Sequence, residues 1–336
     1  MEKTINNTNL KDNFISLFKN NEKDFLFSAS QSLVNKKKEA IRLFEKNGFP
    51  TTKNEEWKYT NISNVLKENF NTDTVEAISD ISLQDFLYKG LEANIVVFVN
   101  GVFNKSLSKI ISDNLEIVDL SGLNNELLDT YFSASINPET DGFTALNTAL
   151  SKHGACIRVA KNKVVELPVL IYYISDTRNG NITYNPRNII VCEENSQLKV
   201  IESFHSIGDT ASLSNIITEV FVKESANVQY YKIQNENEKA VHVGTTQVIQ
   251  DTKSYFSSTT ITLGGGLIRN NLNIKLQGEH AEADLFGLYL SNNTQHTDNH
   301  TLVDHAVPNC LSNELYKGIL NGKSSGVFNG KIIVRP

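Results

Sequence analysis

From about residue 188 onward the sequence repeats one unit, in which a strand, a short polar turn and another strand follow one another. Five equivalent positions can be aligned, Leu198, Val228, Phe256, Ala283 and Asn313, at intervals of 30, 28, 27 and 30 residues. A nearly constant period with almost no helical pattern is typical of a solenoid, because each strand then lies over its equivalent one period earlier. The sequence therefore predicts a mainly β fold with a parallel β-solenoid core.

The repeat stops within a unit, since residues 325–336 indicate one more strand pair with nothing after it. The last layer of a solenoid usually carries a cap, and an uncapped strand exposes backbone groups that can pair with another chain. We therefore expect the β-solenoid core, which we place at residues 153–336, to be incomplete at its C-terminal end. A further part of the protein or a partner would cover this end, and a homodimer through it is one such arrangement.

The residues before the repeat have a different pattern. Apolar residues at helical spacing predict helices within residues 10–47, and Gly48 followed by Pro50 is a helix stop. Residues 94–103 contain an Asn-Gly turn between two apolar runs, which indicates a hairpin, and residues 143–150 form a short helical pattern. We divide the chain into a helical N-terminal region (1–92), a mixed α/β lead-in (93–152) and the core.

Composition excludes several classes of protein. A hydrophobic content of 40% and a charged content of 21% fit a soluble globular protein, and a net charge of −6 argues against a nucleic-acid-binding surface. The chain has no run of eighteen apolar residues that could span a membrane, and residues 1–7 lack the features of a secretory signal. The three cysteines, Cys156, Cys192 and Cys310, lie far apart in the sequence and show no C-x-x-C spacing. This pattern predicts a cytoplasmic protein and no complete iron–sulfur or zinc site.

Motifs for nucleotide binding fail on their spacing. The string Gly322-Lys323-Ser324 resembles the end of a P-loop, but Lys317 stands where that loop needs a glycine. The glycines at 264–266 do not continue into a dinucleotide-binding pattern, because position 269 is arginine, and we interpret them as a corner of the solenoid. The sequence therefore indicates no nucleotide site.

Catalytic patterns are missing as well. No G-x-S-x-G motif occurs, and the carboxylates that a polysaccharide-active solenoid would stack on one face are not in a common register, namely Glu202, Glu219, Glu236 and Asp284. The residues alone thus favour a scaffold that is non-catalytic or depends on a partner, with no catalytic or cofactor-binding residue to name. A β-helix enzyme that acts on polysaccharides stays open as an alternative.

One cluster of residues has the composition of a metal site: His296, Asp298, His300, Asp304 and His305. Imidazole and carboxylate groups together suit divalent transition metals, and in a strand the residues at 296, 298 and 300 project from one face. The candidate ligands are therefore His296, Asp298 and His300, in a stand-alone metal-binding module. The alternative is that these side chains form hydrogen bonds at a polar turn of the stack.

Several segments, taken in order, resemble the SufB/SufD family of iron–sulfur cluster assembly proteins. The segment Glu55-Glu-Trp-Lys-Tyr-Thr60 is similar to a segment that marks the SufD branch of this family. Residues 95–103, 143–150 and 166–168 follow in the family's order. The core then carries a similar series of residues: Asp298, His300, His305, Pro308, Ser312, Lys317, Gly318 and Phe328-Asn-Gly-Lys331.

The resemblance implies a right-handed parallel β-helix with a helical N-terminal region and a helical C-terminal domain. It implies a non-catalytic scaffold subunit that works with SufB-like and SufC-like subunits in cluster formation and iron supply. The chain alone would bind no cofactor, since the complex handles the cluster and the SufC-type ATPase uses ATP.

The resemblance also bears on single residues. It implies that the partner-contacting residues follow the segment 328–331, so that the chain looks like a C-terminally truncated member of the family. It further implies a structural role, in preference to metal binding, for the residues that form the family signature: Trp57, Asp298, His305, Ser312, Lys317, Gly318 and Gly330.

Overall fold

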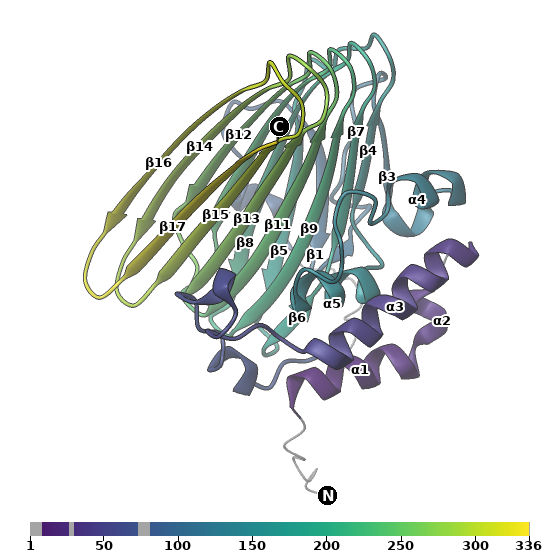
Figure 1. The fold of residues 1–336 in the computed structure, drawn as a ribbon. Coiled ribbons are helices and arrows are strands. Elements are labelled where there is room, and N and C mark those ends of the chain that lie inside the picture. The colour runs from purple at the N-terminus through teal and green to yellow at the C-terminus, as the bar shows by residue number, and fades with distance from the viewer. Residues whose placement is uncertain (1–8, 27–29, 73–80, 336) are drawn as a thin grey trace, which may run out of the picture.

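The computed structural model describes residues 9–26, 30–72 and 81–335. Residues 1–7, which we examined for a secretory signal, and the final residue of the predicted core, Pro336, lie outside the described residues. The fold is mainly β, with a β-solenoid of about six turns and a small helical N-terminal region, as the repeat predicted (Figure 1). No helix in the described part of the chain combines the length and apolarity that a membrane-spanning helix requires.

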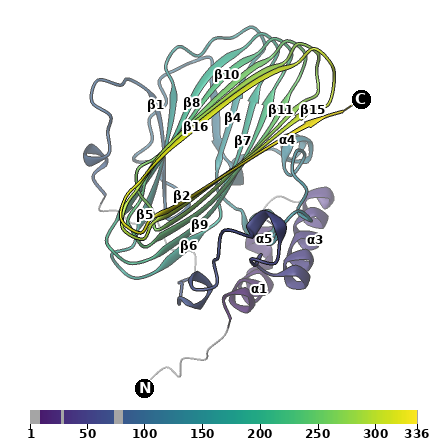
Figure 2. The same cartoon turned by 60° about the vertical axis from the view of Figure 1, so that its left-hand side comes forward.

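Successive strands of the solenoid alternate between two sheets that face each other (Figure 2). The strands are β1 Asn94–Val99, β2 Val102–Phe103, β3 Glu116–Asp119, β4 Ala155–Val159, β5 Val169–Asp176, β6 Ile182–Tyr184, β7 Arg187–Cys192, β8 Gln197–Ile207, β9 Ser212–Val222, β10 Asn227–Asn235, β11 Ala240–Gln250, β12 Tyr255–Thr262, β13 Leu267–Leu276, β14 Glu282–Ser291, β15 His296–His305, β16 Leu311–Leu320 and β17 Ser325–Val334. The eight-stranded sheet has the order β16-β14-β12-β10-β8-β5-β1-β2. The nine-stranded sheet has the order β17-β15-β13-β11-β9-β7-β4-β3, and its ninth strand, β6, pairs with β9 beside this series. Every pair is parallel except β1–β2 and β3–β4.

The register confirms four of the five aligned positions. Leu198, Val228, Phe256 and Ala283 are direct partners on neighbouring strands. The fifth position was wrong by one residue, because Ala283 pairs with Ser312 and not with Asn313. In β16 the apolar alternation misleads, since leucines occupy positions on the exposed face while a serine and a glutamate point inward. A shift of one residue turns every side chain to the other face, so such a strand does not reveal its own register.

The corners between the sheets use left-handed backbone conformations in two ways. One column of corners has no glycine: its residues Asn162, Asn195, Ser225, Lys253, His280 and Asn309 have φ between 56° and 62°. The backbone N–H groups of the first four residues in this column donate to carbonyl oxygens of the next layer, as from Asn195 N to the carbonyl oxygen of Glu224 at 3.0 Å. At the predicted glycine corner, Gly265 has φ +103°, and Cβ atoms at Gly264 and Gly266 would lie 2.4 and 2.2 Å from carbonyl oxygens of the layer below. That interpretation is confirmed.

The helices lie on the outer face of the nine-stranded sheet (Figures 1 and 2). They are α1 Leu10–Asn20, α2 Glu22–Phe25, α3 Gln31–Asn47, α4 Asn125–Tyr131 and α5 Gly142–Leu150. Apolar residues of α1, α2, α3 and α5 share one buried cluster with Leu213 and Val243 of the sheet. Leu128 of α4 lies in a second cluster with Ile189 and Phe221. Helix α3 ends at Gly48, whose φ is +67°, as the helix stop predicted.

Helix α5 joins the outer helices to the sheet, and all nine of its residues are buried. Its N-terminus is capped by Asp141, whose carboxylate accepts hydrogen bonds from the backbone N–H groups of Phe143 and Thr144. The side-chain amide of Asn147 donates to the backbone carbonyl groups of Pro186 and Asn215 at 2.8 and 2.9 Å. The helix thereby fixes the position of the N-terminal region against the solenoid.

Candidate functional site

Two segments that carry the resemblance, residues 54–60 and strand β15, lie against each other on the outer face of the nine-stranded sheet. Within β15, Thr297 and Asn299 form hydrogen bonds to Ser291 and Asn270 on the inner side of the solenoid. The alternate residues His296, Asp298 and His300 contact residues of segment 54–60, so the prediction that they share one face is confirmed. Residues more than 230 positions apart in sequence thus form one junction (Figure 1).

Asp298 lies at the centre of this junction, and neighbouring side chains contact both oxygens of its carboxylate. Its Oδ2 accepts hydrogen bonds from Arg269 Nη1 at 2.5 Å and from the hydroxyl of Thr60. Its Oδ1 lies 3.1 Å from His300 Nε2. Burial alone would raise the pKa of Asp298, but the contacts with His300, Arg269 and Thr60 outweigh it and lower the pKa. The group is therefore an ionised carboxylate held by donors.

The two histidines of the junction have different surroundings. The single hydroxyl proton of Thr60 goes to Asp298, so His296 Nε2, at 2.9 Å from Thr60 Oγ1, is the donor to that oxygen. His296 Nδ1 then accepts from Ser325 Oγ at 2.7 Å. Burial lowers the pKa of His296, which fits this neutral form. His300 lies between two carboxylates, with its Nδ1 3.4 Å from Glu56 Oε2.

Trp57, for which the family resemblance implied a structural role, is a buried aromatic residue that packs on α5. Its indole is 3% exposed and stacks on Phe143 of α5, with ring centroids 5.3 Å apart. The guanidinium carbon of Arg269 lies 4.8 Å from the centroid of the Trp57 ring, on the cation–π scale of distances. Arg269 therefore joins the tryptophan to Asp298, and we call Trp57, Thr60, Arg269 and Asp298 the rim clamp.

A groove of ≈ 910 Å³ runs beside the rim clamp. Its walls are residues 46–50 and 54–57 on one side and residues 135–142 on the other, and its floor is the outer face of β11, β13, β15 and β17. The floor is rich in carboxamide and hydroxyl groups and includes one imidazole: Thr245, Gln247, Asn271, Asn273, His300 and Asn329. This volume falls within the range of small-ligand sites.

The residues that line the groove bear on two alternatives left open by the sequence, a polysaccharide-active enzyme and a metal-binding module. Its aromatic residues, Phe49 and Trp57, are 9% and 3% exposed, so they form no stacking surface for a sugar. Within residues 9–26, 30–72 and 81–335, no three histidine, cysteine, aspartate or glutamate side chains converge as metal ligands. The contacts of His296, Asp298 and His300 thus favour a structural role, and metal binding by these residues stays an untested hypothesis.

The remaining signature residues lie away from the groove's centre. His305 Nε2 is 2.9 Å from Ser312 Oγ, and Asp304 forms a bidentate ion pair with Arg335. Lys317 is exposed. A Cβ at Gly318 would lie 2.2 Å from the ring of Tyr289, so the tyrosine on the neighbouring strand packs over this glycine.

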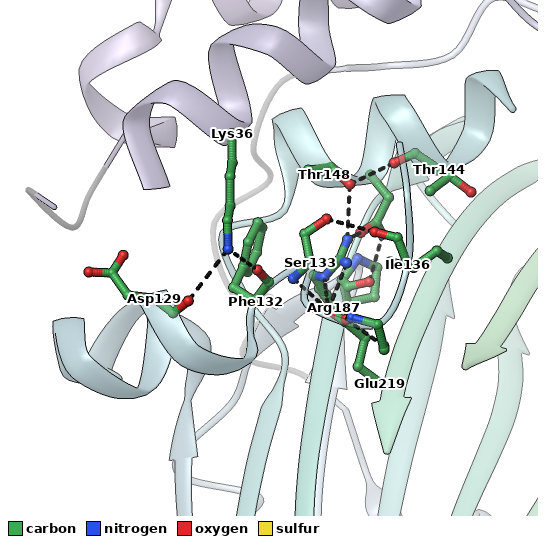
Figure 3. A network of polar contacts seen from close by, with 12 residues as sticks. Lys36, Asp129, Phe132, Ser133, Ile136, Thr144, Thr148, Arg187 and Glu219 are labelled. Atoms are coloured by element: carbon green, nitrogen blue, oxygen red, sulfur yellow. Dashed lines mark hydrogen bonds and ion pairs between the residues drawn. The ribbon is translucent and has the colours of Figure 1, made fainter. Parts of the chain in front are cut away.

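A second arginine cluster lies deeper on the same face of the sheet (Figure 3). Arg187 Nε and Nη2 donate to Glu219 Oε1 at 2.9 and 2.7 Å, and both side chains are 0% exposed. Glu219 also accepts from the backbone N–H groups of Ser133 and Ser135, at 2.8 and 2.9 Å. The guanidinium carbon lies 4.6 Å from the centroid of the Phe132 ring. We call Phe132, Ser133, Ser135, Arg187 and Glu219 the inner clamp.

Neither arginine was predicted from the sequence. Glu219 appeared only among carboxylates without a common register, and its partner Arg187 comes from the adjacent strand of the nine-stranded sheet. Arg269 served only to exclude a nucleotide motif, although this residue is the direct register partner of Asp298. Alignment of the second strand in each period would have found this pair, since the repeat was aligned on the eight-stranded sheet alone.

Family models describe the chain along almost its whole length. Residues 8–171 match a model described as the SufBD protein N-terminal region. Residues 173–336 match a model described as the SufBD core domain of SUF system FeS cluster assembly. The boundary between the two models falls within β5, so the matched regions share the sheets of one solenoid.

Curated relatives carry names of the same family. The chain is 26% identical over 318 residues to an iron–sulfur cluster assembly SufBD family protein of Synechocystis, with 90% of this chain and 69% of the relative covered. It is 26% identical over 291 residues to the iron–sulfur cluster assembly protein SufD of Escherichia coli, covering 85% of this chain and 66% of the relative. A SufBD family protein of Mycobacterium leprae is 27% identical over 204 residues, which are 59% of this chain and 50% of the relative. The chain thus spans from half to about two thirds of these relatives.

Proposed function

Because the chain belongs to the SufBD family of SUF-system iron–sulfur cluster assembly proteins, we propose that it is a non-catalytic scaffold subunit of that machinery. It works with a SufB-like subunit and a SufC-like ATPase in the cytoplasm. The iron–sulfur cluster is the cargo of the assembly, and the ATPase consumes ATP. This chain supplies surfaces that position the other subunits, and it takes part in iron supply.

The observation that carries the proposal is the junction between the two family regions. The N-terminal segment that resembles SufD is held on the core by Trp57, Thr60, Arg269 and Asp298. The polar groups of these side chains form hydrogen bonds and ion pairs with one another. A junction of this kind fits a rigid scaffold better than a reaction centre.

Exposed apolar side chains on the last two strands support a partner surface. They belong to β16 and β17 and are Leu311, Leu315, Ile319, Phe328, Ile332 and Val334, with exposed fractions from 45% to 75%. Apolar side chains in such a row gain free energy when another strand layer covers them. We propose that this layer is strand-bearing, supplied by the family's own core, by a SufB-like subunit or by a second copy.

The test is co-expression of the complete reading frame that encodes this chain with SufB-type and SufC-type subunits of the same genome. One subunit carries an affinity tag, and the purified complex is measured by mass and by cluster absorbance after reconstitution with iron and sulfide. We expect a stable complex that contains this protein and transfers a cluster to an apo-protein. A protein that binds neither subunit would contradict the proposal.

A matched variant distinguishes scaffold from catalyst. Glu56→Gln and His300→Gln each remove one titratable group that lines the groove, from the pair that lies 3.4 Å apart, and keep similar side-chain sizes. A scaffold should retain cluster assembly within about twofold of the original protein in both variants. A loss of more than a hundredfold with the complex intact would indicate chemistry at the groove instead.

A further inference from the structure

The outer face of the eight-stranded sheet is apolar in its last layers. Five large apolar side chains there are 38% to 59% exposed, and they come from the end of β12, from β14 and from β16: Leu263, Phe286, Leu288, Leu315 and Ile319. We call these five residues the apolar face. It contrasts with the groove on the other sheet, whose floor is rich in carboxamide and hydroxyl groups.

The exposure of Phe286 and Leu288 belongs to the face of the sheet and not to its open edge, because β14 is paired with β12 on one side and with β16 on the other. Side chains alternate along the strand, so Leu285, which is 0% exposed, points into the solenoid while Phe286 and Leu288 point outward. The run Leu285-Phe-Gly-Leu-Tyr-Leu290 is thus apolar toward both faces. Such a run is typical of a parallel strand that is covered on both sides.

The chain covers the same face in its first layers with a segment of its own, residues 81–88. The apolar side chains of this segment share a buried cluster with β1 and β5. The ring of Tyr88 stacks on Tyr172 of β5, and its hydroxyl lies 2.8 Å from Ser203 Oγ of β8. Across β10 and β12, the row of the register that contains Ser203 leads to Leu288 on β14. The apolar face therefore extends a surface that already packs against a covering segment at β8.

A helix fits this surface better than a strand does. The strands β12 and β14 are each paired on both sides, so a further strand finds no free backbone partner on them. Helices cover the outer faces of parallel sheets, and an amphipathic helix binds through a stripe of apolar side chains. Lys317 lies between Leu315 and Ile319 on the same face and is exposed. A carboxylate beside the apolar stripe of the helix would complement this ammonium group.

We propose that the apolar face binds an amphipathic helix of a partner subunit, with a carboxylate of that helix opposite Lys317. The inference rests on the proposed function, since it needs a partner subunit. A partner is favoured because Leu315 and Ile319 belong both to the apolar face and to the proposed partner surface on β16. A subunit that docks on the end of the solenoid therefore reaches the apolar face directly, and the helix adds a side-on contact to the end-on one.

Hydroxyl-radical footprinting tests the inference on the protein encoded by the complete reading frame, alone and in the co-expressed complex. Oxidation of Phe286 and Leu288 is measured by mass spectrometry over a range of protein concentrations. Both side chains should be oxidised in the isolated protein, and their oxidation should fall about fivefold or more in the complex, because the core of an interface excludes water. The control is Tyr59, which is 65% exposed and should stay reactive.

Other occupants give different footprints, and each of them would overturn the inference. Protection of Phe286 and Leu288 in the isolated protein at every concentration would mean that the protein's own chain covers them. Protection that is lost on dilution of the isolated protein would mean that a second copy covers them. Full reactivity in the complex would mean that no subunit binds this face.

A matched pair of variants measures the contribution of the apolar face to binding. Leu288→Glu places a charge in the apolar face, and Lys199→Glu is its control, because Lys199 is exposed on the same face of the sheet at β8. The dissociation constant of the complex should rise about tenfold or more in the first variant and stay within about twofold in the second. Circular dichroism shows whether both variants fold.

The exposed residue Lys317 supplies a second variant if Leu288→Glu does not fold. Lys317→Glu should also weaken the complex, because it places a carboxylate opposite the carboxylate of the helix. An unchanged dissociation constant in the folded variants would overturn the inference and leave the proposed function intact. The absence of any complex with the unaltered protein would overturn both.

Discussion

The inner clamp and the rim clamp hold two segments of the N-terminal half on the same outer face, yet their surroundings differ. In each, an arginine lies against an aromatic ring and pairs with a carboxylate of a neighbouring strand. Arg187 and Glu219 of the inner clamp are both 0% exposed, and Glu219 also accepts hydrogen bonds from backbone N–H groups (Figure 3). The rim clamp borders the groove and contacts two histidines, His296 and His300. An arginine–carboxylate pair can thus stabilise the whole fold at one place and hold a single segment on the sheet at another.

The largest effect is expected from the inner clamp. The variant Arg187→Met removes the guanidinium and leaves the carboxylate of Glu219 buried without a cation. Loss of one partner of a buried pair costs about 3–5 kcal/mol, so the free energy of unfolding in urea should fall by about that amount. The control is Arg158→Met, whose ion pair with Glu193 is 2.9 Å long and exposed at the arginine, so its loss should cost about 1 kcal/mol or less. Equal losses in the two variants would show that the inner clamp is not the stabilising element.

The contrast between the clamps also shows where sequence reasoning succeeds. The solenoid follows from period and alternation, because each strand must cover its equivalent in the layer before. The helix stop at Gly48 and the hairpin at Asn100-Gly101 follow from local backbone preferences. None of these depends on which distant residues meet.

The polar contacts could not be derived in the same way. The pairing of Arg269 with Asp298 depends on the register of a strand pair that the alignment did not include. The docking of Thr60 and Glu56 on β15 depends on the path of a connecting segment that has no periodicity. Likewise, the buried positions of Lys232 and His242 are visible only once both sheets are placed, since charge along a strand ordinarily indicates the solvent face.

The rim clamp should give a smaller loss and a local signal. In the variant Arg269→Met, Asp298 keeps its contacts with Thr60 and His300, so we expect a fall of about 1–3 kcal/mol in the free energy of unfolding. Trp57 is the only tryptophan of the chain, so its emission reports on this junction alone. We expect a red shift and stronger acrylamide quenching while circular dichroism still shows the solenoid. Unchanged emission in a folded variant would rule out the clamp as the support of Trp57.

Acid should weaken the rim clamp. The pKa of Asp298 is lowered in the folded protein, so its contribution to stability is present above the unfolded value of about 4 and is lost as the pH falls through the folded value. The difference in free energy of unfolding between the unaltered protein and Asp298→Asn should therefore shrink below about pH 4. Urea titrations at several pH values, followed by Trp57 emission, measure it. A difference that grows in acid would reverse the assigned sign.

The smallest effect is expected at the outer edge of the rim clamp, where Glu56 lies 3.4 Å from His300 and its side chain is 60% exposed. Water and salt screen such a pair, so Glu56→Gln should lower the free energy of unfolding by about 0.5 kcal/mol or less, and the difference should vanish in 1 M salt. Trp57 emission should stay as in the unaltered protein, because the contacts of Asp298 with Arg269 and Thr60 remain. A red shift as large as that of Arg269→Met would instead mean that this exposed glutamate holds the segment, and that the junction is fixed from the groove side.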